Sequence, residues 1–168
     1  MIWVAIGSGA IVASAGQPPR GTNLALPRYH LLVSAALGGA AYAVTRSARA
    51  AVAPLVSGFL IDADHLLDYA LIRTAVGERK ILLALHGWEW LPAWLLADRW
   101  LGMRGALALG YATHLLIDQL SNEKRTPLAY FISYRAAHGF RDDQLGAVEA
   151  NKRHLWRKAS PLGLLRWL

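Results

Sequence analysis

Apolar residues gather into runs along the middle of the chain, and each run is bounded by glycine, proline or clustered basic residues. Runs of this length and composition predict helices, over residues 27–45, 50–68, 81–97 and 106–120. Pro92 lies inside the third run, where a proline removes a backbone donor, so this helix is expected to kink. Short connections place consecutive helices antiparallel, and the pattern therefore predicts an all-α, up-down bundle of about four helices.

The composition indicates that this bundle lies in a membrane. Hydrophobic residues make up 55% of the 168 residues and charged residues only 17%, where about 25% is usual. The apolar runs are about 15 to 19 residues long, close to the lower limit for crossing a hydrocarbon core of about 30 Å. We therefore expect a single integral-membrane domain over residues 1–168, with its helical core at 27–120. Residues 121–168 are polar and basic and predict a tail on the membrane surface.

The net charge of +7 has two interpretations. A basic soluble protein often binds nucleic acid, whereas basic residues that flank apolar runs contact anionic lipid headgroups. Most lysines and arginines lie between the runs and in the tail, so we expect a lipid bilayer as partner and no nucleic acid. More of the basic residues fall at the end of the bundle where residues 27–45 begin. The positive-inside bias places that end at the cytoplasmic face. We therefore expect a protein that crosses the bacterial inner membrane several times. Residues 1–19 carry no charge and predict a loosely membrane-associated segment or a short extra helix.

Ionisable side chains inside or at the ends of the apolar runs are the most informative feature of the sequence. Charges in such places are costly unless they are paired or bind a metal. Because the helices alternate in direction, the starts of the first and third and the ends of the second and fourth lie at one end of the bundle. All the candidate metal ligands occupy these positions: His30, Asp62, Asp64, His65, His86, Glu89, His114 and Asp118.

The chemistry of these side chains limits the choice of metal. The chain has no cysteine, so a metal must be held by nitrogen and oxygen donors, which suit zinc, with manganese or iron as alternatives. His114 and Asp118 are four residues apart and share a helix face. Asp64 falls on a different face from Asp62, where it would serve a second ion or orient a ligating imidazole. The donors are numerous enough for one or two ions.

Each candidate also has an ordinary explanation when it is considered alone. A single histidine such as His30 is more often a packed interfacial residue, and Glu89 would pair with a neighbouring arginine. The agreement of all candidates in membrane depth is what favours a common site. Two other classes of protein are open alternatives to an enzyme in the membrane. One is a membrane protein that uses the metal for structure, ion transport or sensing, and the other is a soluble basic α-bundle that acts on nucleic acid.

Three motifs, in this order, resemble a known family. They are FLIDADHLLDY at residues 59–69, LHGWEW at 85–90 and THLLID at 113–118, and they resemble the bacterial family of small membrane-bound metal-dependent hydrolases. That family is distantly similar to zinc-dependent phospholipase C and to fungal zinc nucleases. The resemblance covers about residues 27–140.

The resemblance implies roles for individual residues. Asp62, Asp64 and His65 match the family's Asp-x-Asp-His element. His114 and Asp118 match its HxxxD element. His86 matches the histidine of its middle motif, and His30 matches its early histidine. The proline usual before the first aspartate is Ile61 in this chain. The middle motif reads His-Gly-Trp-Glu where the family often has two histidines around Arg-Gly, and Glu89 would then replace a ligand.

The resemblance implies hydrolytic chemistry, and a site at a basic membrane surface favours a phosphoester or phosphodiester of a lipid as substrate. A divalent ion lowers the pKa of water from about 15.7 to roughly 7, which provides a hydroxide nucleophile. Asp64 or Glu89 would act as a general base or orient a ligand. Arg135 and His138, together with Arg141, follow the last helix at the site end, where they would either bind the phosphate or protonate the leaving group, or simply contact lipid headgroups.

Overall fold

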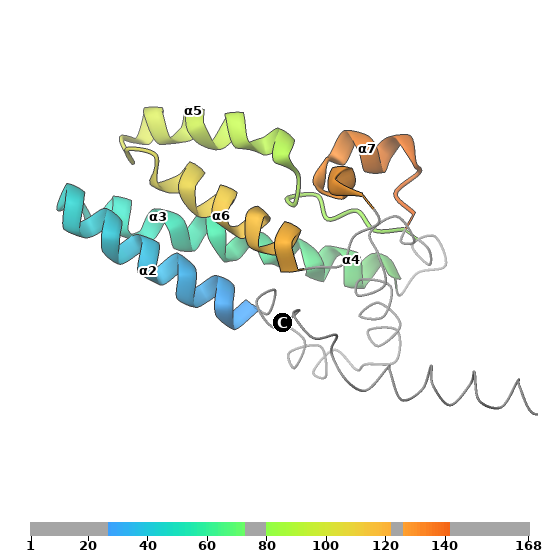
Figure 1. Cartoon of the computed structure of the whole chain (residues 1–168), viewed down its shortest axis with the longest axis horizontal. Helices are drawn as coiled ribbons and strands as arrows, with labels where there is room; N and C mark the ends of the chain where they lie inside the picture. Colours follow the sequence, from blue (N-terminus) through green and yellow to red (C-terminus); the bar gives the residue numbers. More distant parts are fainter. Residues whose placement is uncertain (1–26, 73–79, 122–125, 142–168) are drawn as a thin grey trace, which may run out of the picture.

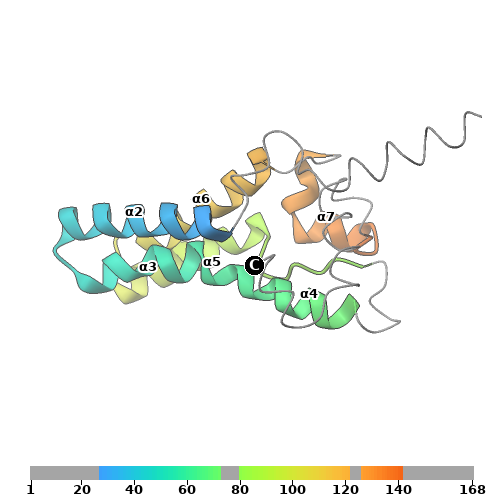
Figure 2. The same cartoon turned by 90° about the horizontal axis from the view of Figure 1, so that it is seen from below.

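Helices α2, α3, α5 and α6 run alternately up and down and pack side by side (Figure 1). Their bounds are Pro27–Thr45 for α2, Ala48–Gly58 for α3, Leu91–Leu101 for α5 and Ala106–Ser121 for α6. The shorter elements are the 3₁₀ helices η2 Leu60–Ala63, η4 Trp88–Trp90 and η5 Pro127–Tyr130, and the α-helices α4 Asp64–Ile72 and α7 Ile132–Ala137. Helices α4 and α7 lie beyond one end of the bundle in both views (Figures 1 and 2).

The computed structural model describes residues 27–72, 80–121 and 126–141, and it contains helices but no strand within them. The expected all-α class is therefore confirmed for this part of the chain. The N-terminal segment and most of the expected basic tail lie outside the described residues.

The first and last expected helices are confirmed almost residue for residue. Helix α2 has the expected bounds, and α6 extends one residue beyond the expected end at position 120. Asp98 on α5 fixes the start of α6, because its buried carboxylate accepts the backbone N–H groups of Leu107 at 3.0 Å and Ala108 at 2.7 Å. These are donors that a helix N-terminus leaves unpaired.

The second expected helix is interrupted. It begins at the cap residue Ser47, whose hydroxyl accepts the N–H of Ala50, and α3 then ends at Gly58. The chain continues through the 3₁₀ helix η2 into α4, which extends away from the end of α3 (Figures 1 and 2). In a 3₁₀ turn the side chains at i and i+3 point the same way. Asp62 and His65 are related by this spacing, and their side chains meet.

The third expected helix, over residues 81–97, is wrong in its first half. Residues 81–87 are not helical, η4 follows, and α5 begins only at Leu91. Pro92 therefore lies in the first turn of α5, where backbone N–H groups make no hydrogen bond within the helix. The absence of an N–H group on proline costs nothing at this position, and Pro92 does not kink the helix. As a result His86 lies in an irregular segment and Glu89 in a 3₁₀ turn, and neither is in the first turns of a helix.

Glycines bring α2, α3 and α6 into close contact. A Cβ atom added at Gly58 would lie 2.6 Å from the hydroxyl oxygen of Ser34 on α2 and 2.9 Å from the carbonyl oxygen of Gly110 on α6. A Cβ atom added at Gly110 would lie 2.7 Å from the Cα atom of Pro54 on α3. Larger side chains would force the helices apart. The close packing therefore sets the distance between α2 and α6, which carry three of the candidate ligands.

Two neighbouring glycines of α2 provide a matched test of this packing. A Cβ atom at Gly38 would overlap the carbonyl oxygen of Ala51, whereas nothing lies within 4 Å of one at Gly39. We expect Gly38→Ala to lower the free energy of unfolding by about 1–3 kcal/mol, because α2 and α3 must separate. Gly39→Ala is expected to raise it by up to about 1 kcal/mol, since alanine favours a helix. Thermal unfolding of the two variants in detergent measures the difference, and equal effects would contradict the packing.

The lengths of the helices bear on the expected membrane crossings. Among the described residues, one helical stretch, Ala48–Asp68, is long and apolar enough to cross a membrane, with 21 residues. Helices α5 and α6, with 11 and 16 residues, are shorter than the roughly 20 residues that a spanning helix needs. Helix length therefore does not support the expectation that the chain crosses the membrane several times.

The outer surface of the bundle is nevertheless apolar. Large hydrophobic side chains are exposed on each of the bundle helices: Leu31, Leu32, Tyr42 and Val44 on α2, Val52 and Val56 on α3, Leu95, Leu96, Trp100 and Leu101 on α5, and Leu109, Leu116 and Leu120 on α6. Soluble monomers rarely expose apolar surface of this extent. Such a surface is typical of helices that contact lipid or another apolar partner.

Candidate metal centre

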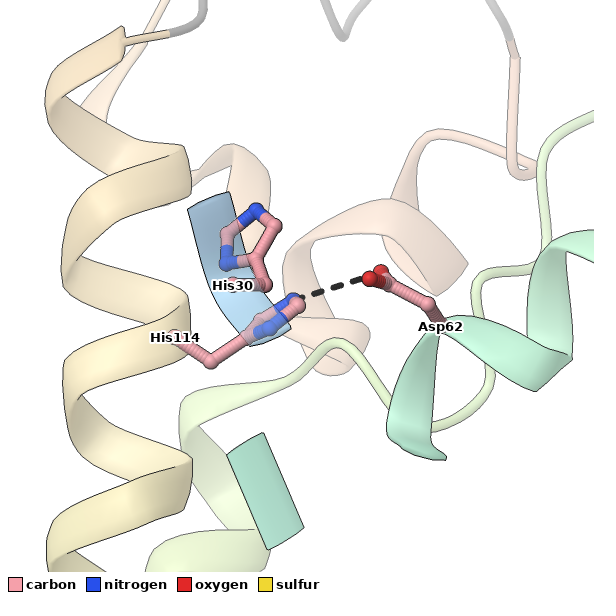
Figure 3. A group of neighbouring side chains, drawn as sticks. All are labelled: His30, Asp62 and His114. Carbon is pink, nitrogen blue, oxygen red and sulfur yellow. Dashed lines mark ion pairs between the residues drawn. The ribbon is translucent and has the colours of Figure 1, made fainter. Parts of the chain in front are cut away.

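Six histidine and aspartate side chains meet at the end of the bundle where α2 begins. They are His30 at the start of α2, Asp62 in η2, His65 in α4, His86 in the segment before η4, and His114 and Asp118 near the end of α6. Figure 3 shows the ring of His30 lying over that of His114, with the carboxylate of Asp62 directed at His114. The structure thus brings together most of the ligands expected from the sequence.

Hydrogen bonds fix which nitrogen carries the proton in the two central histidines. Nδ1 of His114 lies 2.7 Å from the carbonyl oxygen of Gly58, which can only accept, so this nitrogen is the donor. Nδ1 of His86 lies 3.0 Å from Oδ2 of Asp64 and donates to that carboxylate. In the neutral rings both Nε2 atoms then present lone pairs, yet they lie 3.0 Å apart. Lone pairs at this distance repel each other unless a proton or a metal ion lies between them.

Two carboxylates face the same pair of nitrogens. Oδ1 of Asp62 lies 3.3 Å from Nε2 of His86 and 3.5 Å from Nε2 of His114. Oδ2 of Asp118 lies 3.7 Å and 3.6 Å from the same two atoms. Ligands at about 2.0–2.2 Å from a tetrahedral ion are about 3.3–3.6 Å apart. The distances from the two nitrogens to these carboxylate oxygens are therefore close to those between the ligands of one zinc-like ion.

Further histidines extend the cluster on both sides. Oδ1 of Asp118 lies 3.2 Å from Nε2 of His30, whose ring stacks on that of His114 with centroids 3.9 Å apart. On the other side, Nε2 of His65 lies 3.6 Å from Oδ1 of Asp62. Each carboxylate thus reaches one histidine beyond the central pair. The donor set is large enough to hold a second ion.

The charges around His86 favour a cation at its ring. Burial by itself would lower the pKa of this imidazole, which is fully buried. The carboxylates of Asp64, Asp62 and Asp118 outweigh burial and raise the pKa of His86 well above its ordinary value. The same carboxylates would stabilise a divalent ion at Nε2, so that a proton and a metal compete for this position.

Asp64 stands behind His86, away from the facing Nε2 atoms. Its Oδ2 accepts Nδ1–H of His86 and also the backbone N–H of Leu85, at 2.7 Å. A carboxylate in this position fixes the tautomer and the orientation of a ligating imidazole. Of the three roles expected for Asp64, which are metal ligand, general base and orienter of a ligand, its hydrogen bonds fit the orienting one. Asp64 does not belong to the groups of described residues whose atoms could share an ion.

Glu89 lies away from its expected place among the ligands. Oε2 accepts the N–H of Ile132 at 3.0 Å, and Oε1 accepts the N–H and the hydroxyl of Ser133 at 2.9 Å and 2.8 Å. Burial would raise the pKa of Glu89, but these donors at the start of α7 lower it below its ordinary value. The ionised carboxylate caps α7 and is a poor general base. This placement corrects the expectation that Glu89 binds metal or transfers a proton.

The two basic residues expected to contact the substrate also lie elsewhere. Arg135 is 2% exposed, and its Nη2 donates to the carbonyl oxygens of Leu83 and His86 at 2.9 Å and 2.8 Å. His138 is exposed at the end of α7, where its Nδ1 lies 2.9 Å from the carbonyl oxygen of Tyr134 and its ring lies against the tyrosine ring. These contacts do not support the expected roles in binding a phosphate or protonating a leaving group.

Asp68 and Tyr111 hold the segment that carries His86, although the sequence predicts no role for them. Asp68, one turn after Asp64 on α4, accepts two backbone N–H groups of this segment. Tyr111, fully buried on α6, accepts another N–H group with its hydroxyl oxygen. The spacing of the two aspartates is the available signal for the first of them, because it puts both on one face of α4.

Access to the cluster is uneven. His30, His86 and His114 are buried on the bundle side. The side chains of Asp62 and His65 retain exposed fractions of 12% and 14%. A small molecule would therefore meet the cluster from the η2 and α4 side.

Comparison of the chain with models of known protein families, with curated proteins and with solved structures finds no match. The geometry of the cluster is thus the main guide to its chemistry. Buried histidine and aspartate groups of this spacing could hold a metal ion.

Proposed function

We propose that this protein is a metal-dependent hydrolase embedded in a bacterial membrane. The strongest support is the pair of Nε2 atoms on His86 and His114, 3.0 Å apart, while both Nδ1 atoms are engaged elsewhere. A cation makes this arrangement favourable, and Asp62 and Asp118 complete a set of two nitrogen and two carboxylate donors. The likeness of the three sequence motifs to membrane-bound metal-dependent hydrolases supports the same chemistry.

Each residue of the cluster has a distinct part in this proposal. Donors of nitrogen and oxygen without sulfur favour zinc, with manganese or iron as alternatives, and one or two ions. A divalent ion supplies Lewis acidity and makes water acidic enough to react near neutral pH. Asp64 holds the ring of His86 in the ligating tautomer. Asp62 and His65, at the more exposed edge, are the residues that a substrate would meet first.

The apolar outer surface supports a lipid environment for the bundle. Helices shorter than the bilayer are accommodated where the membrane thins or the bundle tilts. The cluster then lies near the membrane surface, because its residues sit at one end of the bundle (Figure 1). The positive-inside bias assigns this end to the cytoplasmic face.

Metal content and turnover of the detergent-purified protein test the proposal together. We expect one or two equivalents of zinc, manganese or iron by elemental mass spectrometry. A chelator should remove the metal and stop hydrolysis of lipid phosphomonoesters and phosphodiesters, and one of the three metals should restore both. A folded protein that neither contains nor takes up metal would contradict the proposal and leave the cluster as an ion path or a polar packing network.

The second candidate is a membrane protein that holds the metal for structure, transport or sensing. The burial of His30, His86, His114 and Asp118 favours it, because structural sites are closed whereas catalytic sites keep a position open for water. Tightly held metal without hydrolysis of any lipid phosphoester would support this candidate against the enzyme. An exchangeable water on a cobalt-substituted centre would support the enzyme.

A further inference from the structure

The backbone that carries His86 is an irregular turn with an unusual conformation. Its first residue, Leu83, has a φ of 41°, a left-handed value that leucine rarely adopts. The N–H of His86 closes the turn on the carbonyl oxygen of Leu83 at 3.0 Å. A single turn bond cannot hold a strained leucine by itself, since such strain persists only where the surroundings enforce it. The surroundings of this turn therefore decide where the imidazole points.

Helix α4 holds the N–H groups on one side of the turn. The carboxylate of Asp68 accepts the N–H groups of Leu82 at 2.8 Å and Leu83 at 3.1 Å. Asp64 accepts the next one, from Leu85, at 2.7 Å. Ionised aspartates only accept hydrogen bonds, so the donors for the carbonyl groups of the turn come from other residues.

Arg135 on α7 supplies a donor for the carbonyl groups at the two ends of the turn, whereas the two carbonyl oxygens between them accept from Nε1 of Trp90 and from the hydroxyl of Tyr111. Nη2 of Arg135 lies 2.9 Å from the oxygen of Leu83 and 2.8 Å from that of His86, and so it joins the two ends of the turn. A guanidinium only donates, which makes it the complement of the two aspartates. Burying a charged side chain is costly, and a buried arginine used in this way fixes its partners firmly.

A second contact joins the same two segments, with the accepting side chain before α5 and the donors on α7. Glu89, three residues after His86, caps the start of α7 through Ile132 and Ser133, and α7 returns Arg135 to His86. The segment that carries His86 is also in close contact with α7, because a Cβ atom on Gly87 would lie 2.5 Å from the side chain of Ile132. Glu89 and Arg135 therefore form a reciprocal pair of contacts, which we name the clasp.

We propose that the clasp sets the position of the His86 imidazole, with Arg135 as the positioning residue, so that residues 126–141 complete a metal centre to which they contribute no ligand. This inference rests on the proposed metal site. It gives Arg135 and Glu89 a function different from the substrate and ligand roles expected from the sequence.

The test compares Arg135→Gln and Arg135→Lys with a control on the same helix, His138→Gln. Zinc affinity is measured by competition with a chromophoric chelator, and the coordination geometry by the absorption spectrum of the cobalt-substituted protein. We expect Arg135→Gln to weaken zinc binding about 10- to 100-fold, as for other residues that orient a ligand, and to change the cobalt spectrum. Arg135→Lys should recover part of the affinity, because an ammonium group can donate to the same carbonyls. His138→Gln should match the wild type.

Circular dichroism and thermal unfolding separate a positioning role from a structural one. If the folded Arg135→Gln protein binds zinc with wild-type affinity and gives the wild-type cobalt spectrum, the clasp does not position His86. If the wild-type protein binds no metal, the proposed function fails, and NMR of histidine-labelled protein then tests the clasp independently. A change confined to the resonances of His86 in Arg135→Gln would support the clasp, and unchanged resonances would overturn it.

Discussion

His114→Ala is expected to leave the protein without bound metal and without turnover. Nε2 of His114 lies 3.0 Å from Nε2 of His86 and within 3.6 Å of carboxylate oxygens of both Asp62 and Asp118, so it faces the other three donors of the central set. An alanine removes this donor and leaves two carboxylates facing one imidazole. One imidazole and two carboxylates would no longer hold the ion of this central set at its previous affinity. Elemental analysis and the lipid phosphoester assay measure the two losses.

His138→Ala is the matched control for this substitution. It removes an exposed imidazole whose hydrogen bond within the described part of the chain is to the backbone of Tyr134, so metal content and turnover should not change. Because His114 is buried, the folded state of His114→Ala is checked by circular dichroism before the metal is measured. Metal at the wild-type level in a folded His114→Ala protein would show that the cluster is not the metal centre.

Val56→Arg is expected to prevent stable insertion of the protein into the membrane. Val56 is 40% exposed on α3 and lies inside Ala48–Asp68, the stretch that is long and apolar enough to span a bilayer. An arginine near the centre of a spanning helix costs about 2.5–3.5 kcal/mol. On the surface of a soluble protein the same substitution would change stability by less than about 0.5 kcal/mol. The fraction of protein that resists carbonate extraction from membranes distinguishes the two environments.

Leu128→Arg provides the comparison, because Leu128 is 47% exposed but lies in η5, outside the bundle. It should leave membrane insertion unchanged. If both variants behave like the wild type, the apolar surface of the bundle does not contact lipid, and a soluble protein with an apolar partner becomes the better description. The proposal of a metal centre would not be affected by that outcome.

The parts of the fold that follow local patterns could be predicted from the sequence. The bounds of α2 and α6 follow from apolar runs that end at turn residues. The alternation of helix direction was enough to bring His30 and His114 to one end, although they come from different helices. Periodicity and connection length carry this information, and both are local properties of the chain.

The structure around His86 could not be predicted in the same way. The apolar residues 81–87 read as a helix, but their N–H groups bond to Asp64 and Asp68 on another element, and such tertiary bonds override local preference. Glu89 carries a carboxylate, which is a common metal ligand, yet its hydrogen-bond partners Ile132 and Ser133 lie 43 and 44 positions further along the chain. The tautomers of the histidines likewise depend on groups far away in sequence.

The irregular segment that carries His86 has a consequence for the order in which the protein matures. Its backbone depends on Arg135, which follows His86 by 49 positions. During synthesis, the chain must therefore be extended from His86 to Arg135 before the imidazole of His86 can be fixed in place. Helices α2 and α3 can pair much earlier, since they are adjacent in the chain. Loading of an ion would then be one of the last events of biogenesis, after the helices have already met.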